Sequence, residues 1–571
     1  MRFESWDIKG FDRQAAVDLC RYGINPLSAV FMSSRGITSV EAADWFLKDD
    51  ASALYSPFLL KDMDEAVTRI QKAMEAGENI AIYGDYDVDG MTATALLVKF
   101  FRSKGVDSEI YIPGRMDEGY GLNRFALDFL SAKGISLIIT VDCGITGIAE
   151  AEYAKELGVE LIITDHHECK DEIPSAVAVI NPKRCDCRYP NKTLAGVGVA
   201  FKLVCAIEKE AQLEMLLDTY SDFVAIGTIS DVMPVVGENR ALIRHGLKIL
   251  NSCPRPGLRQ LMNEAVSERK TISSAAIAFV LAPRLNAAGR MGRTSLSVEL
   301  LLTNDDDEAL TLTRELCILN DERRQIESGI FEEAAQMVKK ITAKGPIVLA
   351  KRGWFQGVMG IIAARIAEQN LFPAILISID ENGIGKGSCR SFASFRLHSA
   401  LIQCDDLLEN YGGHEMAAGL MIKEENIEEF TKRINEYYHE NIKIFPVPTL
   451  RVDFEVEKPA LLMLENIESL VSLEPFGNRN PPPMLCMKNA ALVSARSVGD
   501  GKHARLKVEK SGVVFDCIFF ARAAEELEVA PGDSVDIAFG PVVNEFRGKR
   551  SVQLQVADVK KASGEYQTDK D

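Results

Sequence analysis

The segment Ile80 to Thr94, IAIYGDYDVDGMTAT, decides the fold and the chemistry of this chain. It begins with apolar residues that predict a buried strand, and Asp85, Asp87 and Asp89 follow where that strand ends. Gly90 is expected to let the backbone turn into the helix that the next residues predict. Three neighbouring carboxylates repel one another unless a cation lies among them, and Mg²⁺ and Mn²⁺ favour such oxygen ligands. The alternative is a solvated turn with a helix cap, which needs only one aspartate.

The pattern of a strand followed by a helix continues over the next hundred residues. Helices are predicted at 126–133 and 145–157, between short apolar runs that predict strands. The predicted strands lie at 80–83, 109–112, 137–141, 161–164 and 176–180. Apolar strands that alternate with helices predict an α/β fold, with a parallel sheet covered by helices on both faces.

Polar residues gather at the ends of these predicted strands. Parallel strands end at one edge of their sheet, and ligands bind beyond that edge. After the three aspartates of the first strand, the later strands end at Arg115, at Asp142, and at the triplet Asp165, His166 and His167. A single strand-end Asp or buried His is usually structural. Four strand ends that all carry such groups instead predict one polar site with the acids as candidate metal ligands.

Two later segments add further polar groups. Asp231 follows an apolar helix in FVAIGTISDVMPVV, and the segment LAPRLNAAGRMGR carries Arg284, Asn286, Arg290 and Arg293 around two glycines. We interpret the second segment as a basic loop. Arginine forks match the geometry of phosphate oxygens, which makes this loop a candidate phosphate clamp. The alternative is a basic loop that only faces solvent.

A second α/β unit is predicted beyond a long charged helix at 305–343, which we interpret as a rigid connector. The unit begins at Pro346 and contains Arg390 in IGKGSCRS and His414 in YGGHEMAAGL. Backbone amides at the two glycines of YGGH, together with these two side chains, form a candidate phosphate site. The alternative for His414 is a helix cap or a place in the core.

The chain changes character again after Pro446, where short strands with alternating patterns predict a small β-barrel. Basic residues with aromatic residues between them suit a single nucleic-acid strand, which needs charge for its phosphates and flat faces for its bases. The segment interleaves Lys502, Arg505, Lys507, Arg547, Lys549 and Arg550 with Phe515, Phe519 and Phe546. Each phenylalanine taken alone is more simply a core residue.

The composition fits several domains, because 571 residues with 47% hydrophobic content can build more than one core. No apolar run approaches the roughly 20 residues of a membrane helix, and the start MRFESWDIKG lacks the apolar stretch of a signal peptide. We therefore expect a cytoplasmic protein without a membrane partner. The net charge of −18 argues against nucleic acid as a partner. However, residues 485–561 contain 12 Lys or Arg against 10 Asp or Glu and are locally basic.

Taken in order, the motifs GDYDVDG, VDCG, DHH, TISDV and RLNAAGRM resemble those of the DHH phosphoesterases. The unit that contains YGGH is similar to their DHH-associated domain. LEPFGNRNPPP, followed by a small barrel, resembles the RecJ branch, the single-strand-specific 5′→3′ exonucleases. The resemblance extends over nearly the whole chain. It implies an α/β multidomain protein with an oligonucleotide-binding (OB) barrel at the C-terminal end.

The resemblance divides the chain into six expected segments. The first and the last carry no predicted chemistry, and we expect the last to be disordered. The segments are an N-terminal helical region at 1–75, a DHH catalytic domain at 76–304, a connector helix at 305–343, a DHH-associated domain at 344–445, an OB-fold domain at 446–562 and a tail at 563–571.

The resemblance also implies roles for individual residues. His167 is expected beside the metals and the reacting phosphate, and Arg115 and Arg290 match residues that hold phosphate near the 5′ end. The expected metal ligands are Asp87, Asp89, Asp142, His166 and Asp231, with Asp85 as a further candidate. The expected catalytic residues are Asp142, His167, Asp87 and Asp89. Further candidate phosphate or DNA contacts are Arg284, Asn286, Arg390, His414, Lys502, Arg505, Phe546 and Lys549.

Two positions depart from the family pattern. Small-substrate members of the superfamily often have a histidine where this chain has Tyr83, and Asp85 is an extra acid that is either a ligand or a partner of a ligand. Arg479 stands where the linker motif usually has a glycine. This second difference predicts that the barrel docks differently in detail.

The reaction implied is hydrolysis of single-stranded DNA from its 5′ end, with release of 5′-mononucleotides, in DNA repair and recombination. Two divalent ions about 3.5–4 Å apart would activate water and neutralise the leaving oxygen, with Asp142 as the expected bridge. The imidazole ligand favours Mn²⁺ over Mg²⁺. The alternatives are a phosphodiesterase of short oligonucleotides or cyclic dinucleotides, and an inactive DNA-binding scaffold. We expect a monomer that works with a single-strand-binding protein and a helicase.

Overall fold

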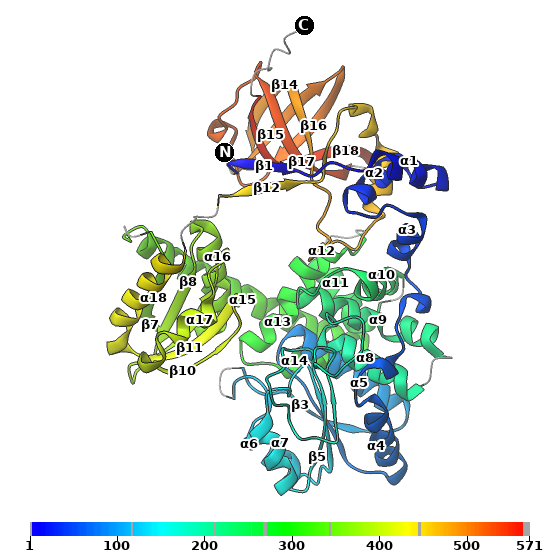
Figure 1. Cartoon of the computed structure of the whole chain (residues 1–571), viewed down its shortest axis with the longest axis vertical. Helices are drawn as coiled ribbons and strands as arrows, with labels where there is room; N and C mark the ends of the chain where they lie inside the picture. The colour runs from blue at the N-terminus through cyan, green and yellow to red at the C-terminus, as the bar shows by residue number, and fades with distance from the viewer. Residues whose placement is uncertain are drawn as a thin grey trace. The chain divides into compact units, whose positions relative to one another are not determined.

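The computed structural model of this chain describes residues 3–115, 118–208, 212–252, 254–266, 271–341, 344–442, 447–546 and 548–562, apart from the side chain of Phe546 (Figure 1). The expected tail at 563–571 lies outside these residues, and so does Arg547. The chain forms two compact units. The barrel unit comprises Met1–Leu54, Val232–His245 and Val447–Asp571, and the two-sheet unit comprises Tyr55–Asp231 and Gly246–Pro446.

The first sheet of the two-sheet unit has five parallel strands in the order β3-β2-β4-β5-β6, which confirms the predicted parallel sheet. β2, β4 and β6 are buried at every residue, which explains their unbroken apolar runs in the sequence. The strands are β2 (Ile80–Tyr83), β3 (Ser108–Tyr111), β4 (Leu137–Val141), β5 (Glu160–Thr164) and β6 (Ala178–Ile180).

Helices cover both faces of this sheet. One face packs against α6 (Arg124–Ala132) and α7 (Ile148–Glu156). On the other face, α5 (Val88–Ser103) and α8 (Gly196–Glu208) contact the central strands. Two further helices, α4 (Met63–Ala76) and α9 (Leu213–Ser230), pack on α8. The N-termini of α5 and α8 therefore lie at the edge where the strands end.

The segment LAPRLNAAGRMGR is helical, so our interpretation of it as a basic loop is wrong. A π-helical turn at Ile277–Leu281 leads into α13 (Ala282–Arg290), whose first turn contains the proline. Gly289 lies inside this helix. A glycine is needed there because a Cβ atom would meet the carbonyl oxygen of Tyr86 at 2.5 Å. The glycine serves close packing, and the sequence alone does not distinguish this use from a loop.

The predicted long charged helix is present as α15 (Asp306–Val338), a single helix of 33 residues. It packs against helices that precede it in the chain and against β7 and α16, which follow it. No helix in the described parts of the chain is both long and apolar enough to cross a membrane. The other helices of this region are α10 (Gly237–Ser252), α11 (Pro256–Ala265), α12 (Ser274–Ala276) and α14 (Ser295–Leu302).

The second sheet of the two-sheet unit is mixed, with the strand order β10-β11-β9-β8-β7. Only β7 and β8 are parallel, and the remaining pairs are antiparallel. The strands are β7 (Ile347–Arg352), β8 (Ala374–Ile379), β9 (Ile384–Arg390), β10 (Leu408–Gly413) and β11 (Ala417–Lys423). The accompanying helices are α16 (Gln356–Asn370), α17 (Leu397–Ile402) and α18 (Ile427–Asn441).

The motif YGGH lies in the hairpin between β10 and β11. Its glycines end β10, and His414 is exposed in the turn, where its backbone N–H donates to the carbonyl of Ala417 at 2.8 Å. His414 is therefore neither a helix cap nor a core residue. Arg390 lies one strand further across, at the end of β9 opposite Ala417.

The barrel unit contains a closed five-stranded barrel, because β14-β15-β16-β18-β17 is completed by pairing of β17 with β14. The predicted barrel is thus confirmed. The strands are β14 (Leu485–Val498), β15 (His503–Lys510), β16 (Val513–Phe519), β17 (Ser534–Phe546) and β18 (Lys549–Lys561). The two-residue strand β13 (Phe454–Glu455) and α19 (Leu464–Val471) precede them.

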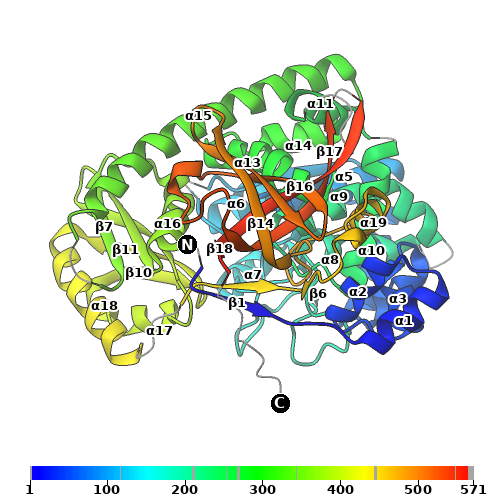
Figure 2. The same ribbon diagram turned by 90° about the horizontal axis from the view of Figure 1, so that it is seen from above.

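The expected helical region at 1–75 is divided between the two units at Leu54, and its part in the barrel unit is not purely helical, which corrects our expectation. Its strand β1 (Ser5–Ile8) pairs in parallel with β12 (Thr449–Val452), and Figure 2 shows the two side by side. The apolar faces of α1 (Arg13–Tyr22) and α2 (Pro26–Ser34) share one core with the barrel. α3 (Val40–Leu47) completes this group of helices.

The linker motif PFGNRN forms a tight turn in the barrel unit. Gly477 and Asn480 exchange two backbone hydrogen bonds, of 2.8 and 3.1 Å. Arg479 between them has a φ of 59°, in the left-handed region that glycine adopts without strain. The turn docks on residues 232–236, because the N–H of Val235 donates to the carbonyl of Asn478 at 2.8 Å. Arginine therefore occupies the conformation for which a glycine is usual.

Candidate active site

The loop after β2 is shaped by the helix that follows it. α5 begins at Val88, so Asp89 and Gly90 lie in its first turn. Asp87 caps the helix, because its Oδ1 accepts the N–H of Asp89 at 2.8 Å and that of Gly90 at 3.2 Å. Gly90 does not turn the chain as we expected. It permits close packing, since a Cβ atom there would lie 2.6 Å from the carbonyl oxygen of Asp85.

The head of α8 brings two further aspartates together. The carboxylate of Asp89 accepts the N–H groups of Gly196 at 2.6 Å and Val197 at 2.9 Å. Asp142 follows β4 with a φ of 61°, a left-handed conformation that is uncommon for a residue other than glycine. A Cβ atom on Gly196 would lie 2.5 Å from the Cβ atom of Asp142. The missing side chain at Gly196 therefore lets Asp142 approach the positive end of the helix dipole.

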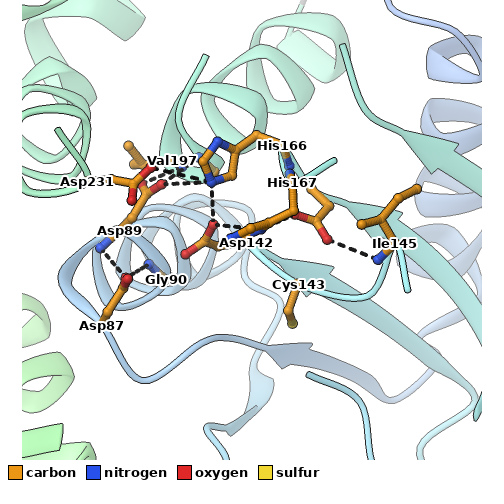
Figure 3. A network of polar contacts seen from close by, with 12 residues as sticks. Asp87, Asp89, Gly90, Asp142, Cys143, Ile145, His166, His167, Val197 and Asp231 are labelled. Carbon is orange, nitrogen blue, oxygen red and sulfur yellow. Dashed lines mark hydrogen bonds and ion pairs between the residues drawn. The ribbon is translucent and has the colours of Figure 1, made fainter. Parts of the chain in front are cut away.

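The expected metal ligands converge in one cluster (Figure 3). Nε2 of His166 lies 3.1 Å from an oxygen of Asp142, 3.5 Å from one of Asp231 and 3.8 Å from one of Asp89. The possible ligand atoms form three overlapping groups, within each of which all atoms lie within 4.8 Å of one another. These groups are Asp142, His166 and His167; Asp89, His166 and Asp231; and Asp85, Asp87 and Asp142.

Burial and mutual repulsion act strongly on these carboxylates. Burial and then the charges of neighbouring aspartates raise the pKa of Asp89 to about 7 and that of Asp231 to about 8. Burial is also the main cause that raises the pKa of Asp85 and Asp142 well above the usual range, and neighbouring aspartates add to it. Such groups bind protons at neutral pH unless a cation compensates their charge.

The hydrogen bonding of the cluster also fits a cation. Burial lowers the pKa of His166 to about 3, and the positive charge of His167 acts in the same direction, so the imidazole of His166 is neutral. Its Nε2 and buried oxygens of Asp85, Asp142 and Asp231 have no hydrogen-bond partner among the described residues. Buried polar atoms are rarely left in this state. A neutral imidazole nitrogen and several carboxylate oxygens are together a suitable donor set for Mn²⁺ or Mg²⁺.

Asp165 is a residue that sequence reasoning places at the rim without assigning it a role. Its buried carboxylate accepts four N–H groups, from the backbones of Ile145, His166 and His167 and from Nδ1 of His167 at 2.8 Å. Burial acts to lower the pKa of His167, but the hydrogen bond with Asp165 and nearby carboxylate charges outweigh it and raise this pKa to about 9. His167 is thereby held as an imidazolium, with the hydroxyl of Tyr120 3.0 Å from Nδ1.

Tyr83, at the position of the superfamily histidine, is not part of the cluster. Its hydroxyl donates to the carbonyl of Gly121 at 2.8 Å, and its ring lies in the core beneath α6 and α7. The side chain of Asp85 is instead among the three that surround one possible ion position, with Asp87 and Asp142.

Three guanidinium groups interact with one another, and two of them, those of Arg115 and Arg290, also interact electrostatically with Asp85 and Asp87 of this cluster. Arg115 lies over the ring of Tyr86 at 4.8 Å, and Arg290 donates to the carbonyl of Gly357 at 3.0 Å. Burial and then the repulsion by Arg115, Arg323 and Arg390 lower the pKa of Arg290 to about 9. Burial also lowers the pKa of Arg390, and repulsion by the charge of Arg115 lowers it further. Arg115, Arg290 and Arg390 form no ion pair with a carboxylate in the described parts of the chain, so an anion would relieve their repulsion.

The other residues of the predicted basic segment have structural contacts. Oδ1 of Asn286 accepts the N–H of Val88 at 3.2 Å and so holds the first turn of α5. Arg284 donates to the carbonyl of Val280 at 2.8 Å, and Arg293 pairs with Glu315 at 3.2 Å. None of these contacts reaches the cluster directly.

The barrel places Phe515 and Phe519 in its core, as each of them taken alone predicts, and not in the aromatic set that would face a nucleic-acid strand. Phe515 and Phe519 point into the barrel and are buried, so they cannot stack on bases, and the side chain of Phe546 lies outside the described atoms. Among the described side chains of the barrel, an exposed ring is that of Phe520, which is 51% exposed and packs edge-on against His503 at 5.3 Å. Strand alternation places Phe515 and Phe519 on one face and could have singled out Phe520.

The predicted basic residues of the barrel that the structure describes lie on its outside. Lys502, Lys507 and Lys549 are exposed. Arg505 is half-buried and pairs with Asp516 at 3.3 Å, and Arg550 pairs with Glu468 at 2.8 Å.

Comparisons with known proteins agree with this architecture. The family models that match are the DHH family N-terminal domain at residues 79–228, the DHHA1 domain at 325–440 and the RecJ OB domain at 452–558. The chain is 38% identical over 560 residues to the single-stranded-DNA-specific exonuclease RecJ of Bacillus subtilis, with 97% of this chain and 70% of the relative covered. Its identity to the exonuclease of the same name from Escherichia coli is 34%, with 94% and 96% covered.

A solved structure extends the similarity to three dimensions. RecJ from Thermus thermophilus, crystallised in complex with Mn²⁺, matches with a TM-score of 0.84 and 30% identity. The match covers 98% of this chain and 80% of that one. The motifs, the closed barrel and this similarity over nearly all of the chain together show that the chain belongs to the RecJ family of DHH proteins.

Proposed function

We propose that this protein is a metal-dependent exonuclease that degrades single-stranded DNA from the 5′ end and releases 5′-mononucleotides. The observation that supports this most is the position of the unpaired guanidinium groups of Arg115, Arg290 and Arg390 near a buried cluster suited to divalent cations. Two bound Mn²⁺ or Mg²⁺ ions would supply Lewis acidity toward the phosphate and lower the pKa of an attacking water.

The carboxylates would hold these ions from two sides. Asp142 is shared by two of the three possible ligand groups, which supports its role as the bridging ligand. Asp85 and Asp87 share one of these groups with it, and His166, which shares the other, also forms a group with Asp89 and Asp231. The backbone N–H groups of Asp89 and Gly90 donate to Asp87, and that of Gly196 donates to Asp89. These three hydrogen bonds would keep the carboxylates oriented.

His167 would act on the substrate. Asp165 accepts a hydrogen bond from Nδ1–H of the imidazolium, so the N–H at Nε2 would be free to donate to a different acceptor. We assign to it a hydrogen bond to an oxygen of the scissile phosphate, where it would stabilise the negative charge of the transition state. Asp165 is a positioning residue in this scheme, since it acts only through His167.

The three arginines would set the direction of cleavage. A terminal phosphate carries more charge than an internal one, and a site with three guanidinium groups favours it. Gly360 makes room for this site, because a Cβ atom there would lie 2.6 Å from an amino group of Arg390. With the 5′ phosphate held here, the next phosphodiester would be the one presented to the cluster.

The cellular setting is part of the same proposal. We place the protein in the cytoplasm, as a monomer that acts in DNA repair and recombination on strands supplied by a helicase or covered by a single-strand-binding protein. The support for a monomer is that one chain carries all the groups of the proposed site. Light scattering of the purified protein tests this, and a dimer would contradict it.

The decisive experiment compares single strands labelled at the 5′ end with strands labelled at the 3′ end, in Mn²⁺. We expect the 5′ label to appear at once as mononucleotide, while the 3′ label passes through progressively shorter strands. Blunt duplex should resist. Early release of the 3′ label would contradict the direction. Cleavage of dinucleotides alone would favour a small-substrate phosphodiesterase.

A further inference from the structure

An open strand edge in the two-sheet unit has no part in the site described so far. β3 is the outermost strand on one side of the first sheet, where it pairs with β2. The carbonyl of Tyr111 accepts the N–H of Gly84 at 2.9 Å, so the backbone groups of Glu109 and Tyr111 face β2. Because backbone groups alternate in direction along a strand, those of Ser108 and Ile110 point away from the sheet.

The opposite edge of the same sheet is closed. β6 is buried at every residue, and side chains complete its hydrogen bonding. The N–H of Val179 donates to Asp62 at 3.2 Å, and the carbonyl of Val179 accepts from Arg184 at 2.6 Å. The outward backbone groups of Ser108 and Ile110 have no such partner among the described residues, and the buried hydroxyl of Ser108 has none either. An edge left in this state is a template for a further strand.

A groove of about 570 Å³ follows this open edge between α6 and α14. Tyr111 faces α6, where its ring lies 5.8 Å from that of Phe129, which is 40% exposed. Ile110 faces the other way, toward the side on which α14 packs on α5 and contributes Val298 and Leu302 to the groove. The groove therefore offers apolar contacts to both rows of side chains of an added strand.

The charged groups around the groove favour a cationic occupant. Three carboxylates line it against one guanidinium group, that of Arg102. Glu109 is paired with Lys133, but Glu299 and Glu308 are exposed and form no ion pair with another described residue. The wall formed by α14 and the start of α15 is therefore acidic, which attracts lysine or arginine and repels an acidic segment.

We propose that this groove docks an extended, basic segment of a partner protein, which adds to β3 as a further strand of the sheet. The backbone of this segment would bond to the outward groups of Ser108 and Ile110, as in other cases of strand addition. Its apolar side chains would pack on Val298 and Leu302, and a lysine or arginine would pair with Glu299. The inference goes beyond the proposed hydrolysis, because the groove holds none of the proposed metal ligands or phosphate-binding arginines.

Two other occupants fit this groove less well. A nucleic-acid strand would bring its phosphates against Glu299 and Glu308, and it has no peptide groups to match the strand edge. A second copy of this chain would bring two such acidic walls together. Charge and backbone chemistry together therefore favour a basic protein segment.

A library of random heptapeptides displayed on phage tests the chemistry of the occupant. Selection on the whole protein should enrich peptides in which apolar residues alternate with lysine or arginine. The same selection on Ile110→Pro should lose them, because proline removes the outward N–H and is tolerated on edge strands. Recovery of no peptides, of acidic peptides, or of the same peptides on both proteins would overturn the inference.

Glu299→Lys tests the charge and leaves the backbone of the groove untouched. The Kd of a selected peptide, measured by fluorescence anisotropy, should rise about fivefold, because an exposed ion pair is replaced by a repulsion. Glu156→Lys is the matched control, since Glu156 is exposed on α7 and does not line the groove. Both variants should cleave single strands at the wild-type rate. Equal peptide affinities of the two variants would contradict the assignment.

Hydrogen exchange distinguishes strand addition from simple adhesion of a basic peptide. The outward amide of Ile110 should exchange fast in the free protein and slowly with saturating peptide, whereas that of Tyr111, which faces β2, should be slow throughout. Unchanged exchange at Ile110 with the peptide bound would refute strand addition. A 20-nucleotide single strand should not displace the peptide, and displacement would overturn the inference by making the groove a nucleic-acid surface.

Discussion

Replacing Gly196 with alanine should disable hydrolysis, although Gly196 has no side chain of its own. A Cβ atom at this position would lie 2.5 Å from Cβ and 2.6 Å from Oδ1 of Asp142. Carbon atoms in ordinary contact are about 3.5–4.0 Å apart. The methyl group and the Asp142 side chain must therefore separate by about 1 Å. Neither the backbone of α8 nor that of the loop after β4 can yield alone, because Gly196 also donates to Asp89 at 2.6 Å.

The expected magnitude follows from this displacement. A catalytic group misplaced by about 1 Å loses about a hundredfold in rate, so kcat should fall by about that factor. The fold should survive. Crowding a packed site costs about 1–3 kcal/mol, and alanine regains about 0.5–1 kcal/mol over glycine inside a helix. Strand binding should remain, since the barrel and the guanidinium groups are not touched.

The assay is single-turnover cleavage of a 5′-phosphorylated strand in saturating Mn²⁺, together with the Tm of each protein. Gly198→Ala is the matched control on the same helix, because its Cβ atom would meet only the flexible side chain of Leu194, at 3.3 Å. This control should keep nearly the full rate. A folded Gly196→Ala protein that cleaves at the wild-type rate would refute the argument that the head of α8 positions Asp142.

Three further changes test other parts of the site. Asp165→Asn should lower the pKa of His167, which stands at about 9 against an ordinary 6.5. A raised pKa stabilises the folded protein fully below about pH 6.5, and this stabilisation is lost as the pH rises through about 9. In metal-free protein, the difference in Tm between the variant and wild type should therefore shrink over that range. A constant difference would contradict the role of Asp165 in holding the proton of His167. Arg290→Gln should slow cleavage of 5′-phosphorylated strands about tenfold or more and 5′-hydroxyl strands little; equal losses would mean that Arg290 does not contact the 5′ end. Phe520→Ala should weaken anisotropy-measured binding of long strands about fivefold or more at unchanged Tm, and unchanged affinity would exclude this ring.

The sequence is most informative where chemistry and periodicity coincide. Buried parallel strands leave unbroken apolar runs, and polar residues after them must share one edge of the sheet. This is why Asp85, Asp142 and His166 can be grouped before any coordinates, and the structure brings them together. Asp165 is visible in the same triplet, but its four hydrogen bonds depend on backbone positions that the sequence does not encode locally.

Other features are inaccessible to sequence reasoning because they depend on contacts between distant residues. Gly90 and Gly289 resemble turn or loop residues, yet both serve close packing against segments that only the fold brings near. The pairing of β1 with β12 joins residues more than 440 positions apart, which no local pattern predicts.

The composition of the barrel unit has a consequence for how the protein is made. Its segment Met1–Leu54 leaves the ribosome well before Val447–Asp571, which completes its core. At roughly 5–20 residues per second, the apolar faces of α1 and α2 wait about 20 to 80 s for their partners. The two-sheet unit can close around its own cores during that interval. Nascent chains stalled before Val447 should therefore expose Leu19, Leu27 and Phe31 to chaperones, and a truncation near Lys458 would leave the same surface open permanently.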